Sequence, residues 1–197
     1  MNLLRGLINS SGFTLITFLF LLAFSSTAFS QSVPVRAEVR AISGTATFST
    51  NGSPARPLKA GTLVSSGATI QTDAGSSVDL FLGHSAGMIR IGEKSTLQLD
   101  KLEITDTGAD TAVDVDVGLP DGEMFFNVNK MSKGSRYQIK MPTGVAGIRG
   151  TKGRFSFRPT GGSKPPVVLL TGSVIYEHTP PGSPASTFLM TTPPPVY

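Results

Sequence analysis

The stretch Met141-Pro142-Thr143-Gly144-Val145-Ala146-Gly147-Ile148-Arg149-Gly150-Thr151-Lys152-Gly153-Arg154-Phe155-Ser156-Phe157 decides the fold of this chain. Large apolar and polar residues alternate in Tyr137–Met141, which leads into the stretch, and again in Phe155–Phe157 at its end. Such alternation predicts two half-buried β-strands. Between them a glycine recurs at every third position, at Gly144, Gly147, Gly150 and Gly153. Glycine permits backbone torsions closed to other residues and a close approach of two backbones, so we expect a strand, a tight turn and a second strand.

Two hypotheses fit this turn. In the first it is architectural: Val145 and Ile148 point inward, and Arg149 is solvated or bonded to free carbonyl groups. In the second, backbone amides beside Arg149 and Lys152 bind a phosphate or carboxylate. The glycine spacing matches neither the P-loop nor the dinucleotide-binding pattern, and no helix start is evident to hold an anion. We therefore expect a structural role for Arg149 and strong destabilisation when Gly147 or Gly150 is replaced.

The same residues resemble a known family. The run Pro142–Lys152, with a strand on either side, resembles the signature of the FecR domain family, and its most specific part is Val145-Ala146-Gly147-Ile148-Arg149-Gly150-Thr151. The resemblance covers about residues 38 to 178. It implies an extracytoplasmic all-β domain, often solenoid-like, and the best-known members relay a signal from an outer-membrane receptor to a sigma factor. Further segments that resemble successive family strands are Gly61–Val64, Ile70–Thr72, Ser77–Leu80, Ile89–Gly92, Gly122–Phe126 and Leu170–Val174.

The chain departs from those regulators at its N-terminal end. The regulators carry a cytoplasmic segment that binds the sigma factor, followed by a membrane span. Here a short apolar segment precedes the domain. We therefore expect the FecR-like domain without the cytoplasmic anti-sigma segment, and no direct regulation of a sigma factor.

The composition favours many short strands over helices. The 197 residues include 22 glycines and 14 prolines but no tryptophan. Without cysteine, the fold cannot rest on disulfides or on thiolate metal sites. We expect an all-β fold of short strands in a solenoid-like or two-sheet sandwich arrangement. A unit of glycine, polar, apolar, any and aromatic residue, compatible with both, appears as Gly44–Phe48, Gly122–Phe126 and Gly172–Tyr176.

Three segments divide the chain. Residues 1–30 carry the apolar run Phe13–Phe24 and end with small residues, as a secretory signal peptide does. The run of about 12 residues is short of the ~20 needed to span a bilayer, although an uncleaved anchor is the alternative. Residues 31–178 form the β domain. Residues 179–197 are rich in proline, so we expect a flexible extended tail in which Phe188–Met190 either docks back on the domain or meets a partner.

Two patterns suggest chemistry but lack its context. Gly83-His84-Ser85-Ala86-Gly87 matches the nucleophile-elbow motif, with His178 further along, but a strand follows where a helix is required. We expect Ser85 at a hairpin tip without catalytic function. Aspartates at 110, 114, 116 and 121 offer calcium ligands, but the calcium-loop pattern is missing and a solvated strand face is the simpler interpretation. We expect no metal and no cofactor.

Charge is distributed unevenly along the chain. Residues 93–117 hold seven acidic side chains, whereas residues 121–158 hold eight basic ones. One end of the domain would then be acidic and the other basic, which steers charged partners, although two solvated faces are the commoner cause. The formal net charge of +4 is modest, and we expect no binding of nucleic acid.

These observations predict a secreted or periplasmic, non-enzymatic FecR-like binding or scaffolding module of the bacterial cell envelope, with a role in signal relay as an open possibility. The expected partner is an envelope protein or a glycan, with no stable membrane span after signal cleavage. The alternative is an envelope enzyme such as a glycan hydrolase. A hydrolase needs paired carboxylates across a cleft, and no spacing in the sequence marks such a pair.

The targeting segment makes the first prediction. We expect the mature protein to start at Gln31, because small residues precede this position after a short apolar run. N-terminal sequencing of the protein from its native host measures this directly. Recovery of an intact Met1 terminus from the membrane fraction would instead identify the run as an anchor.

Overall fold

The computed structural model describes residues 32–106, 110–157, 167–179 and 184–192. These ranges contain 16 strands and no helix, which confirms the all-β class, and a helix with the length and hydropathy to span a membrane is absent from them. The expected signal peptide lies outside the described residues. The strands are β1 (Ser32–Pro34), β2 (Ala37–Ser43), β3 (Ala46–Thr50), β4 (Arg56–Pro57), β5 (Leu63–Val64), β6 (Ala68–Thr72), β7 (Ser77–Gly83), β8 (Gly87–Ile91), β9 (Thr96–Asp106), β10 (Thr111–Asn127), β11 (Arg136–Met141), β12 (Gly144–Ile148), β13 (Lys152–Phe157), β14 (Val167–Thr171), β15 (Ser173–His178) and β16 (Ser186–Thr191).

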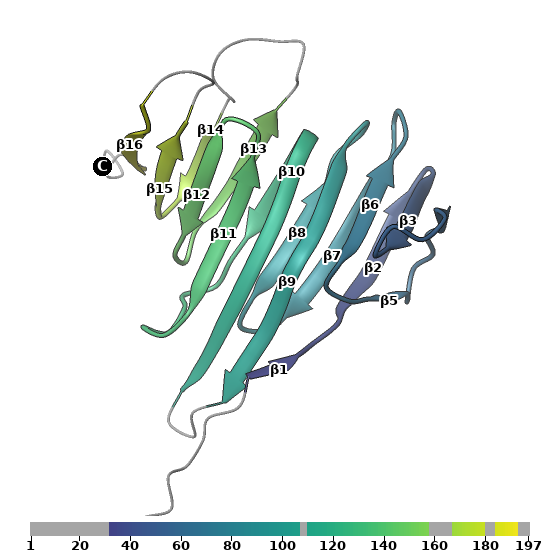
Figure 1. Ribbon diagram of the computed structural model, residues 1–197, viewed down its shortest axis with the longest axis horizontal. Coiled ribbons are helices and arrows are strands. Elements are labelled where there is room, and N and C mark those ends of the chain that lie inside the picture. The colour runs from purple at the N-terminus through teal and green to yellow at the C-terminus, as the bar shows by residue number, and fades with distance from the viewer. Residues whose placement is uncertain (1–31, 107–109, 158–166, 180–183, 193–197) are drawn as a thin grey trace, which may run out of the picture. The chain divides into compact units, whose positions relative to one another are not determined.

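Strand β10 joins all the strands into one large mixed sheet that is not closed (Figure 1). Its first half pairs with β11 up to Gly118 and with β9 up to Asp121, and its second half pairs with β13 from Gly122 and with β8 from Met124. The first layer of the sheet has the order β16-β15-β12-β11-β10-β9-β6-β3-β4, with β1 also beside β9. The second has the order β14-β13-β10-β8-β7-β2-β5. The pairing of β10 with β11 is parallel, and the other described pairings are antiparallel.

The chain passes from one layer to the other at corners, and glycine makes the turn there. Gly44, Gly122 and Gly172 have φ angles of +76°, +111° and +92°, which other residues adopt only with strain. These are the first residues of the three sequence units noted above. The second and fourth residues after each glycine turn inward: Ala46, Met124, Phe126, Val174 and Tyr176 are buried and Phe48 is half-buried. The unit is therefore the sequence signature of a corner.

Buried hydroxyl groups link neighbouring corners. The backbone N–H of Thr45 donates to Ser76 Oγ (2.9 Å), and that of Glu123 donates to Ser95 Oγ (2.9 Å). Thr72 Oγ1 donates to the carbonyl of Gly92 (2.6 Å) and accepts from the N–H of Ser95 (3.0 Å). Because buried polar groups are costly without partners, these short side chains satisfy backbone groups that the turns remove from the strand ladders.

One hydrophobic core lies between the layers. Its cluster contains Ile70 and Leu97 from the first layer together with Leu80 and Ile89 from the second, so the two layers pack face to face. Tyr137 is also enclosed, and its hydroxyl has no hydrogen-bond partner in the described part of the chain. Burial raises the pKa of this hydroxyl because the interior disfavours the phenolate.

The stretch that decides the fold contains three strands where two were predicted. Residues 144–148, expected to form the turn, are strand β12, which pairs with β11 on one side and β15 on the other. The bends fall on either side of it, at Pro142–Thr143 and at Arg149–Thr151. Gly150 has a φ of +64°, as expected for a bend, but Gly147 has no positive φ and is an ordinary strand residue. The glycines that recur at every third residue therefore do not all lie in bends.

The expected extended tail contains a strand at residues 186–191, and of the two alternatives given for Phe188–Met190 the structure has the one in which this segment docks back on the domain. Residues 186–191 form β16, which pairs antiparallel with β15 over its whole length. The prolines of this region lie outside the strand, at positions 180, 181, 184 and 193–195. Ser186–Thr191 therefore keeps every backbone N–H for pairing. Residues 180–183 and 193–197 lie outside the described residues.

Substitution of Gly150 is expected to destabilise the fold, whereas substitution of Gly147 is expected to be tolerated. Gly150→Val forces a β-branched residue to positive φ, and its Cβ would lie 3.1 Å from the backbone Cα of Lys130. We expect a loss of about 1–3 kcal/mol and a melting temperature lower by several degrees. Gly147→Ala is the matched control, since the nearest atom to its Cβ is the Ile175 carbonyl oxygen at 3.8 Å. Thermal unfolding of both variants tests this, and a Gly150→Val protein that melts like wild type would exclude the strained corner.

Candidate functional site

The family motif divides into buried and exposed positions. Along β12, Ala146 and Ile148 face the core, while Val145 and Gly147 are half-buried on the other face. Of the two residues expected to point inward, Ile148 does so and Val145 does not, because residues 144–148 form a strand instead of a turn and positions 145 and 148 of a strand face opposite sides. Thr151 is buried, and its Oγ1 donates to the carbonyl of Ser173 (2.8 Å), which ties the corner to β15.

Arg149 is the free side chain of the motif. It is exposed, and no hydrogen bond or ion pair joins its guanidinium to the described residues, so of the two expected states of Arg149 the structure has the solvated one and not the one bonded to carbonyl groups. The side chain borders a shallow groove of about 270 Å³ that Gly147, Ile175 and Leu189 also line. Lys130 lies beside Gly150 at the same corner. Anion binding here stays a prediction.

The serine motif lies at a hairpin tip, as the sequence predicts. Strand β7 ends at Gly83 and β8 begins at Gly87, so Ser85 is in the turn between two strands. Asn129 Nδ2 donates to the carbonyl of His84 (2.5 Å), which holds the tip against the loop after β10. A nucleophile elbow requires a helix after the serine, and a strand follows here.

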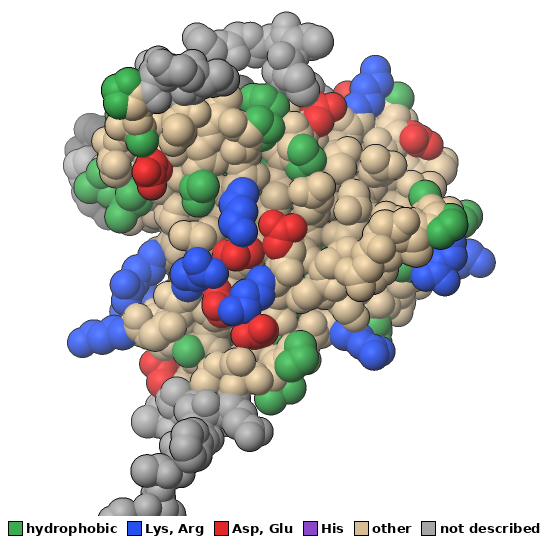
Figure 2. Space-filling model, in the orientation of Figure 1, with side chains coloured by type: hydrophobic (Ala, Val, Ile, Leu, Met, Phe, Trp, Pro, Cys, Tyr) green, Lys and Arg blue, Asp and Glu red, His purple; other side chains and the backbone are tan. Residues whose placement is uncertain are grey.

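The acidic and basic parts of the sequence meet on the outer face of the first layer. The parallel register of β10 and β11 places Asp114 opposite Arg136, and the Nε–Oδ1 distance is 3.0 Å. Asp114 also contacts Lys101 (2.6 Å), while Asp116 contacts Arg136 (3.2 Å) and Lys140 (3.0 Å). Figure 2 shows acidic and basic side chains intermixed over β9, β10 and β11. The prediction of one acidic and one basic end is wrong because pairing across the sheet brings the two segments together.

These ion pairs also bear on the calcium hypothesis. The interpretation of these aspartates as a solvated strand face is wrong for Asp116, which is buried. Asp114 accepts hydrogen bonds from Lys101 and Arg136 through its two carboxylate oxygens. Asp116 accepts from Arg136 and Lys140 through Oδ2 alone, and its buried Oδ1 has no hydrogen-bond partner in the described part of the chain. Within the described ranges no three His, Cys, Asp or Glu side chains gather as a metal-binding group.

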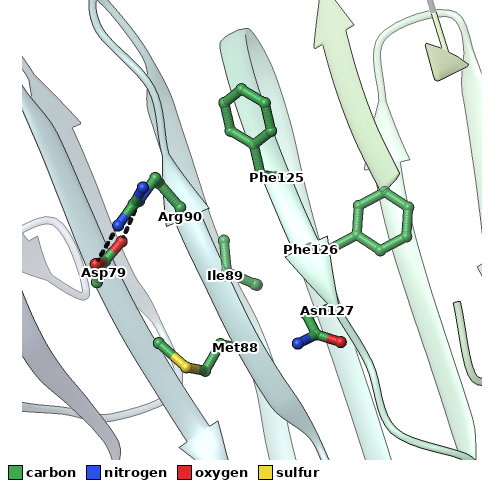
Figure 3. A pocket seen from close by; sticks show the side chains of 7 residues that line it. All are labelled: Asp79, Met88, Ile89, Arg90, Phe125, Phe126 and Asn127. Atoms are coloured by element: carbon green, nitrogen blue, oxygen red, sulfur yellow. Dashed lines mark hydrogen bonds and ion pairs between the residues drawn. The ribbon is translucent and has the colours of Figure 1, made fainter. Parts of the chain in front are cut away.

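A second surface lies on the outer face of the second layer (Figure 3). It is a shallow pocket of about 380 Å³ lined by strands β7, β8 and β10. Met88 and Phe125 are each 39% exposed there, beside the guanidinium of Arg90. Arg90 donates from Nε and Nη2 to the two oxygens of Asp79 (2.5 and 2.7 Å), which holds its side chain toward β7 at one side of the pocket (Figure 3).

The apolar face continues beyond the pocket. Phe81 lies opposite Met88 in the β7–β8 pair, and the guanidinium of Arg40 lies 4.3 Å from the centre of its ring. At the other side Phe125 lies opposite Arg154, which is ion-paired with Glu123 (2.9 Å). Aromatic and methionine side chains thus alternate with arginines that carboxylates hold in place.

Sequence reasoning missed this pocket, although a signal for it exists. Met88-Ile89 and Phe125-Phe126 are pairs of consecutive apolar residues within strands. Successive side chains of a strand point to opposite faces, so one member of each pair must leave the core. Ile89 and Phe126 are buried, and Met88 and Phe125 are the members that face outward.

The ion-pair cluster predicts a dependence of stability on pH. Partial burial alone would raise the pKa of Asp114, but hydrogen bonds and charge from Lys101 and Arg136 outweigh it and hold the pKa below its usual value. A lowered pKa contributes stability that is present above the unfolded value of about 3.9 and is lost as pH falls through the folded value. Asp114→Asn should lower the melting temperature by about 2–4 °C at pH 7 and flatten its fall below pH ~4.

Thermal unfolding between pH 3 and pH 7 measures this effect. Glu103→Gln is the control, since Glu103 contacts Lys101 at 3.2 Å and should matter less. Equal pH profiles for wild type and Asp114→Asn would show that the cluster does not contribute.

Comparison with known proteins identifies the family. The model of the family described as FecR protein matches residues 68–175, more than half of the chain, from β6 into β15. The match includes the motif corner and the pocket of Met88 and Phe125. Searches of curated proteins and of solved structures gave no match. The FecR domain is generally non-catalytic and is linked to envelope signalling. With its motif, its all-β sheet and this match in agreement, the chain belongs to the FecR family.

Proposed function

We propose that the protein is a non-enzymatic binding module of the bacterial cell envelope, periplasmic or extracellular, that holds an envelope protein on the face formed by Met88 and Phe125. The observation that carries the proposal is the pocket itself. Contiguous exposed apolar patches on folded proteins mark interaction sites, whereas single exposed apolar side chains need no explanation, and here Met88 and Phe125 line one pocket. Aromatic residues, methionine and arginine are the types enriched at protein interfaces.

The pocket is built for contact. Its floor, Ile89 and Phe126, belongs to the core, so the surface is rigid before a partner arrives. Arg90 is already oriented by Asp79 and loses little conformational freedom on binding. A partner that covers Met88 and Phe125 gains from burying their apolar surface.

The described residues do not support the alternative of a glycan hydrolase. Such an enzyme needs one carboxylic acid and one free carboxylate on either side of the scissile bond. On this face Asp79, Glu123 and Glu38 are ion-paired with Arg90, Arg154 and Arg40, respectively. Ser85 lies in a hairpin turn.

The envelope location and the role in signal relay rest on different observations. The N-terminal apolar segment supports export. Membership of the FecR family supports signalling, because the family is linked to it. The proposed mechanism is scaffolding: the module presents a fixed surface to its partner and performs no chemistry on it.

A pull-down from envelope extracts tests the binding face. Wild type is compared with a Met88→Ala and Phe125→Ala double variant, and Leu63→Ala is the control because Leu63 is 54% exposed and lies outside the pocket. We expect the double variant to capture the partner with an affinity at least about tenfold lower, because the loss of buried apolar surface removes ~1.4 kcal/mol of binding free energy. Unchanged melting temperatures show that all three proteins fold.

Two outcomes contradict the proposal. Capture at the wild-type level by the double variant would place the binding face elsewhere. Captured material that resists protease but not glycosidase would make the partner a glycan.

A further inference from the structure

The inference concerns β16, the last strand of the first layer. Within the described chain β16 pairs with β15 on one side, and no described strand pairs with its other side. The N–H of Thr192 donates to the carbonyl of Gly172 (3.2 Å), so these two residues are a hydrogen-bonded pair of the β15–β16 ladder. In the register of the ladder, hydrogen-bonded and non-hydrogen-bonded pairs then alternate from this point. Antiparallel pairs alternate, so the backbone groups of Thr187, Leu189 and Thr191 point away from β15 toward the open edge.

The strand carries none of the devices that block pairing at an edge. Ser186–Thr191 contains no charged residue and no proline, and its register with β15 has no bulge. It also exposes large apolar side chains: Leu189 is 68% exposed and Phe188 is 45% exposed. Figure 2 shows hydrophobic side chains where β15 and β16 lie. Such an edge is a template for another strand.

The sequence of the strand indicates which strand fits. Thr187-Phe188-Leu189-Met190-Thr191 has the same pattern in both directions, with Leu189 at the centre, an apolar residue on each side and a threonine at each end. An antiparallel pairing of this segment with itself places threonine opposite threonine and leucine opposite leucine. Because the segment is uncharged, self-pairing brings no like charges together.

We propose that two copies of the protein associate by antiparallel pairing of β16 with β16 about a two-fold axis at Leu189. In this register Thr187 of one copy lies opposite Thr191 of the other, and the two Leu189 residues face each other. These three positions are the ones whose backbone groups point to the open edge, so the register uses all of them. A C2 interface of this kind is self-complementary.

The same register covers the core-facing side of the strand. Phe188 lies opposite Tyr176 of β15, which is buried, so Phe188 is on the core side although it is half exposed. Pairing about Leu189 places Met190 of the second copy opposite Phe188 and extends the core across the interface. A shift by one residue would place residues whose backbone groups point to the open edge opposite residues whose backbone groups point to β15, and the hydrogen bonds between the copies would be lost.

This inference is independent of the proposed function. The pocket of Met88 and Phe125 belongs to the second layer, whereas β16 belongs to the first. Failure of one experiment leaves the other unaffected.

Cysteine cross-linking gives a direct test, because the chain has no cysteine of its own. In a hydrogen-bonded antiparallel pair the Cα atoms are about 5.5 Å apart, within the ~4.4–6.8 Å that a disulfide spans. We expect Leu189→Cys to form a disulfide-linked dimer under mild oxidation. Ile175→Cys is the matched control: Ile175 is 56% exposed on β15, and its copy would be three strand spacings away, roughly 14 Å.

Sedimentation velocity gives the second measurement. We expect the wild-type protein to dimerise as its concentration rises, and Leu189→Lys to raise the dissociation constant at least tenfold. Leu63→Lys, at a similarly exposed position on β5, should dimerise like wild type. Equal melting temperatures of the monomers show that both variants fold. A wild type that stays monomeric at all concentrations, a dimer that survives Leu189→Lys, or equal cross-linking at positions 175 and 189 would each overturn the proposal.

Discussion

The turn at the corners is the constraint on which the rest of the structure depends. A chain that moves repeatedly between two packed layers must reverse direction within two or three residues while a neighbouring corner presses against it. At Gly122 an added Cβ would meet Ser95, whose hydroxyl accepts the backbone N–H of Glu123. Glycine allows the positive φ, and the hydroxyl restores the lost hydrogen bond. Each corner thereby fixes which residues of the next strand face the core.

The parallel pairing of β10 with β11 has the largest effect on the surface. It is the place where the chain leaves the first layer, crosses the second and returns alongside itself. That return brings Arg136 and Lys140 to Asp114 and Asp116 and neutralises charges that lie far apart in sequence. The charged face of the first layer is therefore balanced internally, and Arg149, which has no ion-pair partner among the described residues, lies at its margin.

The sequence predicts the elements of this fold better than their connections. Alternation identifies strands such as β7, β8 and β11, because burial of one face leaves a period of two. It does not distinguish Gly147 from Gly150, since the same residue type serves an extended strand and a strained corner. Prolines around β16 conceal a short strand between them. The pocket and the ion pairs depend on register between distant strands, which no local pattern contains.

Strand β10 has a further consequence for how the protein opens. A single covalent segment carries hydrogen-bonded neighbours on both sides in each layer, so neither layer can detach without breaking the other. Local fluctuations must therefore begin at the outer strands, and the amides of β10 exchange with solvent when the whole domain unfolds. The two layers of the described domain therefore form one cooperative unit, and β10 offers no hinge between them at which a load applied to the surface would be relieved.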